Sequence, residues 1–574
     1  MVLAAVLGLS TCISGLFVDD YVHLLSIEGR VPTTSPFDLF NFASGKPGEV
    51  TKMMGFLPFP WFTYLDVKLH FFRLLSCATM VLDHSLFGRN PVAFHAQSAL
   101  WYVAFVWGAW LIFKRSLPRA LAGLAIVLFA MDFGHVLATA WWSNRNALVA
   151  VVPALYGLWA HLRWREDGWR WGLPLSLVLY ALGLSGGEMA IGVFGYLGAY
   201  ELFGDRGPWV RRIAALVPAG LLAVAYLAIY KANGYGTHGS GIYIDPAENP
   251  LQFLLHAPER ILMLIAAQFF LAPVEIPAGS QAAFWPILVL CAVLTALTVH
   301  LARDAWKDFD DDAHRGLIWL VAGALFSCAP VLSTFASARL LMGPSIGAIP
   351  LLAAILLHLR VAKRRGLRAA YVWLFFLHVI LAPLTWPGLS FALGHIDTLT
   401  RLSISRAEID NSKAADQIVI VPVAPDPLTA MYTVVMREYD GNPRLKAWLS
   451  LSMAQCAHRL SRPAANQLAL ELGNGEYLDS LFEQLLRSPE IPFHVGERIT
   501  LPQMTVEILA LGPKAMPNRV RFEFPGDLDQ PPYVFLKWKE DHLARFTLPK
   551  VGETMDFPLD HGILDGRLLF GARR

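Results

Sequence analysis

Two adjacent carboxylates, Asp19 and Asp20, follow an apolar run from Val2 to Val18. A carboxylate that is partly shielded at a membrane surface loses hydration, which raises its pKa and makes it a better proton acceptor. His23 follows in the same stretch, FVDDYVHL. One acidic residue at a helix end is commonly a solvated cap, but a tandem pair beside a histidine is a candidate for general-base chemistry.

Further ionisable residues stand at the ends of apolar segments. His70 and Arg73 precede an apolar stretch, Arg145 lies between two asparagines in SNRN, and Glu188 follows LSGG between two apolar runs. Arg339 follows the segment STFASA. A charged side chain in hydrocarbon costs at least about 2.5–3.5 kcal/mol, so intramembrane charges that persist commonly mark function.

Each of these residues also has a simpler structural interpretation. Arg73 and Arg339 could anchor their segments at the membrane interface, and Arg145 could snorkel or pair with a carboxylate. Glu188 could cap the helix that follows it, because the helix dipole favours a carboxylate there. Histidines are more often packed or hydrogen-bonded than catalytic.

The composition places these residues in a membrane protein. Of 574 residues, 55% are hydrophobic and 16% are charged, against about 25% charged in an average soluble domain. The net charge of +2 gives no indication of a nucleic-acid partner. The five cysteines are scattered without metal-ligand spacing, so they predict neither a metal site nor a disulfide framework.

Eleven segments meet or approach the roughly 17–25 apolar residues that a spanning helix needs. They begin near Val2, Pro91, Ala120, Ala140, Gly172, Glu188, Ile213, Phe284, Gly316, Arg339 and Ala370. The positive-inside rule assigns the basic connections to the cytoplasm, namely 114–119, 161–171, 204–212, 300–315 and 358–368. This predicts eleven spans with the N-terminus inside, provided that 260–276 is a re-entrant or interfacial helix on the outer side.

The first apolar segment lacks a basic leader and could also be a signal peptide. LSTC at 9–12 resembles a lipoprotein cleavage site, but Thr11 fits poorly before the cysteine. We favour a retained helix. In either case a long loop, 19–90, lies on the outer side of the membrane. The predicted topology also puts the candidate residues at the outer ends of their segments: Asp19, Asp20, His70, Arg73, Arg145, Glu188 and Arg339.

The character of the chain changes after Leu393. Residues 1–396 form the predicted membrane domain, whereas 397–574 lose the long apolar runs and gain charge and proline. Alternating stretches predict strands over 417–423, 505–511, 519–524 and 533–538. Helical spacing predicts a helix over 476–488. We therefore expect a polytopic α-helical membrane protein with a β-rich, soluble α+β domain on the outer side.

The sequence resembles bacterial multi-spanning glycosyltransferases of the GT-C superfamily over roughly its first 230 residues. The likeness rests on a first helix ending in FVDDYVHL, an outer loop with LHFFRLL and LDHSLFGRNPVAFHAQSALWYV, and the later WWSNRNALVAVV and LSGGEMA. Relatives often have Arg-Pro where this chain has Arg73-Leu74, and Lys-Glu where it has Gly187-Glu188. The resemblance implies an enzyme of the bacterial inner membrane that takes a sugar from a polyprenyl-phosphate carrier at the outer face.

The resemblance also implies a role for each candidate. Asp19 would be the general base that deprotonates an acceptor hydroxyl, in a displacement that inverts the anomeric carbon. Asp20 would orient the acceptor or share a divalent cation (Mg or Mn) with Asp19, although the sequence does not require a metal. The remaining residues would bind substrate, with the arginines around the donor phosphate: His23, His70, Arg73, Arg145, Glu188 and Arg339.

Other functions remain open at this point. A lipid-linked substrate transporter or flippase would line a pathway with the same charges, but transporters usually place them near the bilayer midplane, often with inverted repeats. No internal repeat is evident here. A polysaccharide polymerase or ligase would depend on a large outer loop. A non-catalytic scaffold would leave Asp19 and Asp20 dispensable, and the acceptor could be a glycan, a lipid or a protein.

Overall fold

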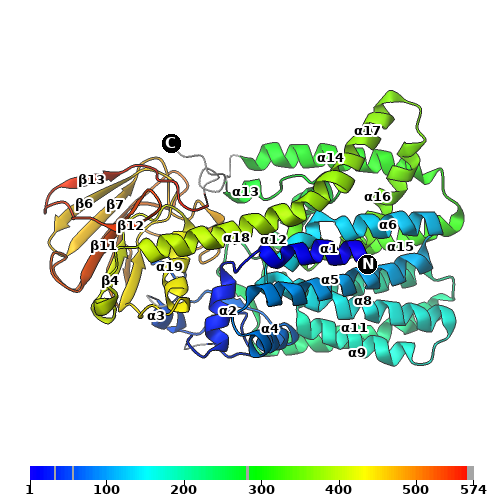
Figure 1. Ribbon diagram of the computed structural model, residues 1–574, viewed down its shortest axis with the longest axis horizontal. Helices are drawn as coiled ribbons and strands as arrows, with labels where there is room; N and C mark the ends of the chain where they lie inside the picture. Colours follow the sequence, from blue (N-terminus) through cyan, green and yellow to red (C-terminus); the bar gives the residue numbers. More distant parts are fainter. Residues whose placement is uncertain (32–33, 55–56, 58, 280–282, 565–574) are drawn as a thin grey trace.

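The computed structural model consists of a long helical body with a sheet-rich C-terminal domain at one end (Figure 1). It describes the chain except for residues 32–33, 55–56, 58, 280–282 and 565–574. The helices of the body are α1 (Val2–Ser10), α5 (Pro91–Ser116), α6 (Arg119–Met131), α7 (Val136–Ala140), α8 (Asn146–Asp167), α9 (Gly172–Gly186), α10 (Ile191–Ala199), α11 (Trp209–Ala232), α12 (Pro250–Phe270), α13 (Ile276–Gly279), α14 (Phe284–Trp306), α15 (Asp311–Ser327), α16 (Ser345–Arg360), α17 (Arg365–Phe375) and α18 (Ala382–Arg406).

The body is that of a polytopic membrane protein. Within the described residues, seven helical segments are long and apolar enough to cross a membrane, or eight if the bent pair Arg119–Met131 and Phe133–Ala140 forms one span. Eleven spans are not confirmed, because the segments predicted near Val2, Gly172, Glu188 and Arg339 form shorter helices, of which α16 is the longest with 16 residues. Hydropathy sums apolar residues without detecting the breaks between short helices.

The five basic connections lie together at the end of the body that is remote from the C-terminal domain (Figure 1). Three ion pairs and one hydrogen bond join each connection to the next. The ion pairs are Arg115 to Glu166 at 2.8 Å, Arg165 to Asp205 at 2.8 Å and Arg206 to Asp312 at 3.0 Å, and the hydrogen bond joins His358 to Asp308 at 2.6 Å. They therefore share one side, as the positive-inside rule requires. The cytoplasmic assignment of that side stays a prediction.

The segment predicted to re-enter the membrane overlaps the end of α12. Before α12 ends, the Gln252 amide donates to Glu490 of the C-terminal domain at 2.6 Å. After it, Glu275 accepts a hydrogen bond of 2.7 Å from the backbone N–H of Ala338, next to Arg339. Both flanks thus lie towards the C-terminal domain, which favours a re-entrant or interfacial helix, although α12 is long enough to span.

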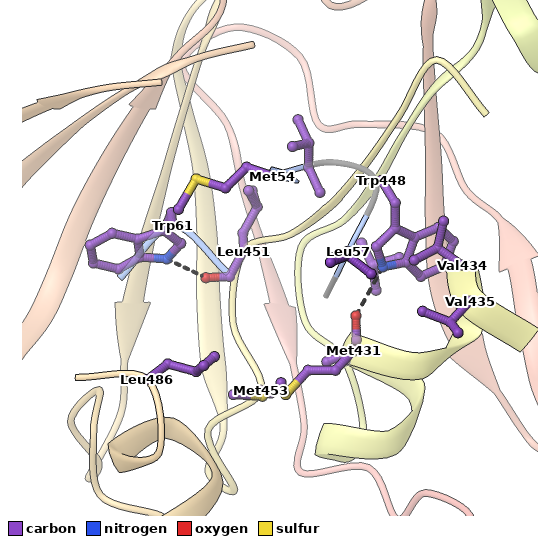
Figure 2. Packing of buried hydrophobic residues seen from close by; sticks show 14 of the residues in the cluster. Met54, Leu57, Trp61, Met431, Val434, Val435, Trp448, Leu451, Met453 and Leu486 are labelled. Atoms are coloured by element: carbon purple, nitrogen blue, oxygen red, sulfur yellow. Dashed lines mark hydrogen bonds between the residues drawn. The ribbon is translucent and has the colours of Figure 1, made fainter. Parts of the chain in front are cut away.

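The long first loop folds into the core of the C-terminal domain. Trp61 is 1% exposed, its indole N–H donates to the carbonyl of Leu451 at 2.8 Å, and its ring centroid lies 5.0 Å from that of Tyr477 (Figure 2). The loop contains α2 (Asp19–Ile27), β1 (Asn41–Ser44), α3 (Glu49–Met53), β2 (Lys68–His70) and α4 (Leu74–Phe87), and β1 and β2 form a small antiparallel sheet with β3 (Gly236–His238).

The C-terminal domain contains two sheets. One has the order β12-β11-β4-β5, with β4 parallel to both neighbours, and the other is antiparallel with the order β13-β6-β7-β10-β9-β8. The elements are β4 (Ile418–Val421), α19 (Pro427–Tyr439), β5 (Ala447–Ser450), β6 (His458–Ala464), β7 (Gln467–Leu472), α20 (Leu481–Gln484), β8 (Arg498–Thr500), β9 (Thr505–Leu511), β10 (Pro517–Glu523), β11 (Tyr533–Lys539), β12 (His542–Arg545) and β13 (Thr554–Phe557).

Local sequence patterns predicted the strands of this domain better than its helix. The four predicted strands are present as β4, β9, β10 and β11. The helix predicted over 476–488 is wrong except for the four residues of α20. The backbone of this segment bonds to other elements instead, since Leu486 accepts from the N–H of Tyr64 at 2.9 Å and Ser488 donates to Gly239 at 2.7 Å.

The predicted division between residues 396 and 397 falls inside α18. This helix continues to Arg406 and runs from the body into the C-terminal domain (Figure 1). The apolar run ends at Leu393, but the helical hydrogen bonds continue through the polar residues that follow. A change in composition marks where the apolar surface ends, and it does not mark where a helix ends.

Candidate functional site

Asp19 begins α2 at the junction between the body and the C-terminal domain. Val18 before it has φ 37, a conformation rare for a β-branched residue and costing about 1–3 kcal/mol. Asp19 Oδ1 accepts a hydrogen bond of 2.7 Å from Tyr432 Oη on α19. Burial raises the pKa of Asp19, while the Tyr432 hydrogen bond and the charges of Arg339 and Arg73 oppose that rise. The result is a partly shielded carboxylate of the kind that a general base requires.

Asp20 holds the start of α2 to neighbouring segments of the chain. Its side chain is fully buried and accepts the backbone N–H groups of Ser143 at 2.8 Å and Phe17 at 2.9 Å, together with the Ser143 hydroxyl. Burial raises the pKa of Asp20 to about 7, against the effect of these hydrogen bonds. Both oxygens are occupied, so Asp20 fixes α2 against η3 (Ser143–Arg145) and is not free to orient an acceptor.

Arg73 and Glu188 form one unit with aromatic walls. The Nε of Arg73 lies 3.1 Å from Glu188 Oε2, and the Oη of Tyr230 donates to Glu188 Oε1 at 3.2 Å. The guanidinium carbon stands 4.7 Å from the ring centroids of both Phe40 and Phe71. Within the described part of the chain, no acceptor bonds to the terminal nitrogens of Arg73, which therefore remain available to a ligand.

Gly187, next to Glu188, has a backbone conformation that favours glycine. Its φ of 152° is accessible to glycine and strained for other residues. A Cβ at this position would lie 3.6 Å from Cγ of Arg73. It would also lie 3.6 Å from Cβ of Ala150, so a side chain at this position would be in contact with both Ala150 and Arg73.

Arg339 provides a second available guanidinium. It lies in η8 (Ala338–Met342), with its guanidinium carbon 6.0 Å from the ring centroid of Trp141 and 5.9 Å from that of Phe335. Its charge acts on Asp19. Among the residues that the structure describes, Arg339 has no ion-pair or hydrogen-bond partner, so two arginines with unused donors lie within electrostatic reach of Asp19.

Arg145 has a structural position instead. It is 1% exposed, and its Nη1 lies 2.6 Å from Asp83 Oδ2, which also accepts the indole N–H of Trp142 at 2.8 Å. Thr79 Oγ1 accepts a further hydrogen bond from Arg145 at 3.2 Å. Arg145 therefore orders the segment that carries Ser143, and it is not placed to bind a donor phosphate.

The two candidate histidines are packed among aromatic rings. His23 is fully buried, its ring centroid lies 4.8 Å from that of Phe40, and burial lowers its pKa to about 3. His70 Nε2 lies 2.9 Å from Asp38 Oδ1, and its ring centroid lies 4.4 Å from that of Tyr235. His23 therefore packs against Phe40, one of the two rings beside Arg73, whereas His70 pairs with Asp38. Within the described residues, neither histidine has a hydrogen bond to Asp19.

Several residues of the site gave no signal in the sequence. Asp397 of α18 accepts the backbone N–H of Leu16 at 3.4 Å and the hydroxyl of Tyr21, and so holds the chain on both sides of Asp19. Tyr432 and Asp397 lie hundreds of residues from Asp19, in stretches without a motif. Only Ser143 could have been suspected, because it stands in SNRN beside Arg145.

The described residues contain no group of three or more His, Cys, Asp or Glu side chains arranged to hold a metal ion. The tandem aspartates themselves diverge. Asp19 bonds to α19 and Asp20 bonds to η3, so the two carboxylates do not converge on one point.

No family model and no curated protein matches the chain. The solved structures that match include the oligosaccharyltransferase of Archaeoglobus fulgidus in its apo form, with 13% sequence identity and a TM-score of 0.37. The match covers 75% of this chain and spans 63% of the length of that protein. The function is therefore argued from the residues of this chain.

Proposed function

We propose that this protein is a membrane glycosyltransferase of the GT-C type. It moves a sugar from a polyprenyl-phosphate carrier to an acceptor hydroxyl, at the membrane face that carries the C-terminal domain. One observation carries the proposal: a partly shielded carboxylate, Asp19, lies within electrostatic reach of two arginines with unused donors, Arg73 and Arg339. The resemblance of the first 230 residues to this superfamily supports it.

In this reaction the carboxylate and the two arginines have different roles. Asp19 takes the proton of the acceptor hydroxyl as its oxygen bonds to the anomeric carbon. The bond from that carbon to the carrier phosphate breaks, and the phosphate leaves with the electron pair. Arg73 and Arg339 offset the phosphate charge. Attack opposite the leaving group inverts the anomeric centre.

The neighbours of these residues set their geometry. Glu188 and Tyr230 hold Arg73, while Asp20 and Asp397 hold the turn that carries Asp19. The lipid tail of the carrier explains why the site stands at a membrane interface. We place the enzyme in the bacterial inner membrane, with the C-terminal domain on the periplasmic side.

The location of the charges favours transfer over transport. A transporter would concentrate its charged groups near the bilayer midplane. Here Asp19, Arg73 and Arg339 gather at the end of the body that carries the C-terminal domain, opposite the basic connections.

The first prediction is that Asp19→Asn abolishes transfer. We would measure transfer from radiolabelled polyprenyl-phosphate hexoses and pentoses by membranes containing wild type or variant at matched expression. Loss of a general base should slow transfer by about 10²-fold or more. Asp66→Asn, at an exposed aspartate of the same loop, is the matched control and should transfer normally. Wild-type rates in Asp19→Asn would remove Asp19 from the chemistry, and no transfer from any donor by folded wild type would contradict the enzyme proposal.

A further inference from the structure

The C-terminal domain contributes a side chain to Asp19 through α19. One face of this helix, with Met431, Val434 and Val435, packs into the core of the domain (Figure 2). Successive helical residues are turned by about 100° from each other, so Tyr432 leaves that core face. Its Oη donates to Asp19 Oδ1 at 2.7 Å across 413 residues of sequence.

The helix that carries Tyr432 is held at both ends. At its start, Asp426 accepts the backbone N–H of Thr429 at 2.6 Å. At its end, Arg89 of the first loop donates to the carbonyl of Tyr439 at 2.6 Å, with its guanidinium carbon 4.5 Å from the Tyr439 ring centroid. The position of Tyr432 relative to α2 is thus fixed by the fold and does not depend on the Asp19 hydrogen bond alone.

The hydrogen bond from Tyr432 makes the two carboxylate oxygens of Asp19 different. Oδ1 of Asp19 accepts from Tyr432, whereas Oδ2 has no donor within the described chain. A carboxylate held in this way presents one defined oxygen to an acceptor hydroxyl. Four groups face Asp19 electrostatically: Tyr432 from α19, Arg339 from η8, Arg73 from the segment before α4, and Asp20 beside it. Tyr432 is the neutral donor among them.

We propose that Tyr432 is a positioning residue for the general base, so that the catalytic centre is completed by the C-terminal domain. This inference rests on the proposed glycosyl transfer with Asp19 as base. A phenol donor stabilises the ionised carboxylate more than the acid, and the ionised form is the one that accepts a proton. The hydrogen bond from the C-terminal domain therefore opposes the effect of burial on Asp19, favours its ionised form, and fixes the direction of its free oxygen.

The second prediction concerns Tyr432→Phe, measured as kcat/KM against pH with the donor that wild type uses. Loss of a hydrogen bond to a charged group should cost about ten-fold in kcat/KM. Because the ionised form of Asp19 loses a donor, its pKa rises and the acidic limb of the profile should move to higher pH. Tyr533→Phe is the matched control, since Tyr533 belongs to the same domain, packs against Phe524 and has no hydrogen bond from its hydroxyl within the described residues.

The outcomes separate the two proposals. If Asp19→Asn abolishes transfer but Tyr432→Phe has the rate and acidic limb of wild type, the inference fails and the proposed function stands. If Tyr432→Phe loses rate without a displaced limb, Tyr432 is merely structural and the inference also fails. If Asp19→Asn transfers normally, both proposals fall. Equal thermal midpoints of the two tyrosine variants exclude misfolding as the cause of a displaced limb.

Discussion

At the scale of residues, the partners of an arginine distinguish a structural from a functional role better than its charge does. Arg145 is buried and engages Asp83 and Thr79, whereas Arg339 lies on aromatic rings with no acceptor among the described residues. Both arginines stand at the edge of apolar segments, so the sequence alone makes both of them candidates for binding the donor phosphate. Burial and the ion pair with Asp83 separate Arg145 from Arg339.

The third prediction contrasts these two arginines. Arg145→Met leaves Asp83 buried without its cation, which should lower the free energy of unfolding by about 3–5 kcal/mol. Arg339→Gln leaves no buried charge, so its thermal midpoint should match that of wild type while the KM for the polyprenyl-phosphate donor rises. Thermal unfolding in detergent and donor titrations check both. A normal KM in Arg339→Gln would remove Arg339 from phosphate binding, and a normal midpoint in Arg145→Met would remove the structural role.

The tandem aspartates show how far the sequence reaches at this scale. It predicted that Asp19 and Asp20 belong to a site at the end of an apolar segment; the structure shows both at the start of α2, and their membership of a site stays a prediction. The sequence could not tell them apart, because adjacent residues in a helix point about 100° away from each other and the partners of each come from distant segments. Tyr432 donates a hydrogen bond to Asp19, and Ser143 donates to Asp20.

At the scale of elements, local signals predicted what local interactions determine. Helix α5 has Asn90 accepting the N–H of Val92, Pro91 at its first position, and Lys114 and Arg115 in its last turn, so its bounds follow from sequence. The segment 476–488 has helical spacing too, but backbone bonds to the first loop and to the residues that follow β3 override it. Intrinsic helix propensity is a weak preference, and backbone hydrogen bonds to distant segments outweigh it here.

The fourth prediction concerns the first loop, which carries Asp19 and is fastened by Trp61. Trp61→Ala removes a fully buried indole and its bond to Leu451, which should cost about 3–5 kcal/mol. Limited proteolysis of the loop 19–90 should become faster, because the loop loses its buried contact with Leu451 of the C-terminal domain, and transfer should fall with it. Phe37→Ala in the same loop, where the ring is 56% exposed, should change neither. Unchanged proteolysis in Trp61→Ala would mean that the loop does not depend on the C-terminal core.

At the scale of the whole molecule, the first loop and the C-terminal domain form one unit that closes one end of a helical body. The sequence predicted the body and the domain, but not their shared core, because Trp61 and Leu451 are 390 residues apart and no local pattern records such a contact. The same unit carries Tyr432 and Asp19 together. A domain described as separate by composition therefore contributes a side chain to the candidate site.

The fifth prediction tests this arrangement across the membrane. In a chain whose five native cysteines are replaced by alanine, single cysteines at Ala247 and Ile276 flank α12, and one at Asp312 lies in a basic connection. All three positions are exposed. An impermeant thiol reagent applied to intact spheroplasts should label Ala247→Cys and Ile276→Cys, whereas Asp312→Cys should react only after permeabilisation.

The result decides the topology on which the site depends. Because the flanks of α12 bond to Glu490 and Ala338, joint labelling of the two flanking cysteines means that α12 re-enters or lies at the interface, and that the basic connections remain on one side. Labelling of Ile276→Cys only after permeabilisation would mean that α12 spans the membrane. Glu275 would then lie on the opposite side from Gln252, which contradicts the contact that sets Ala338 and its neighbour Arg339 beside Asp19.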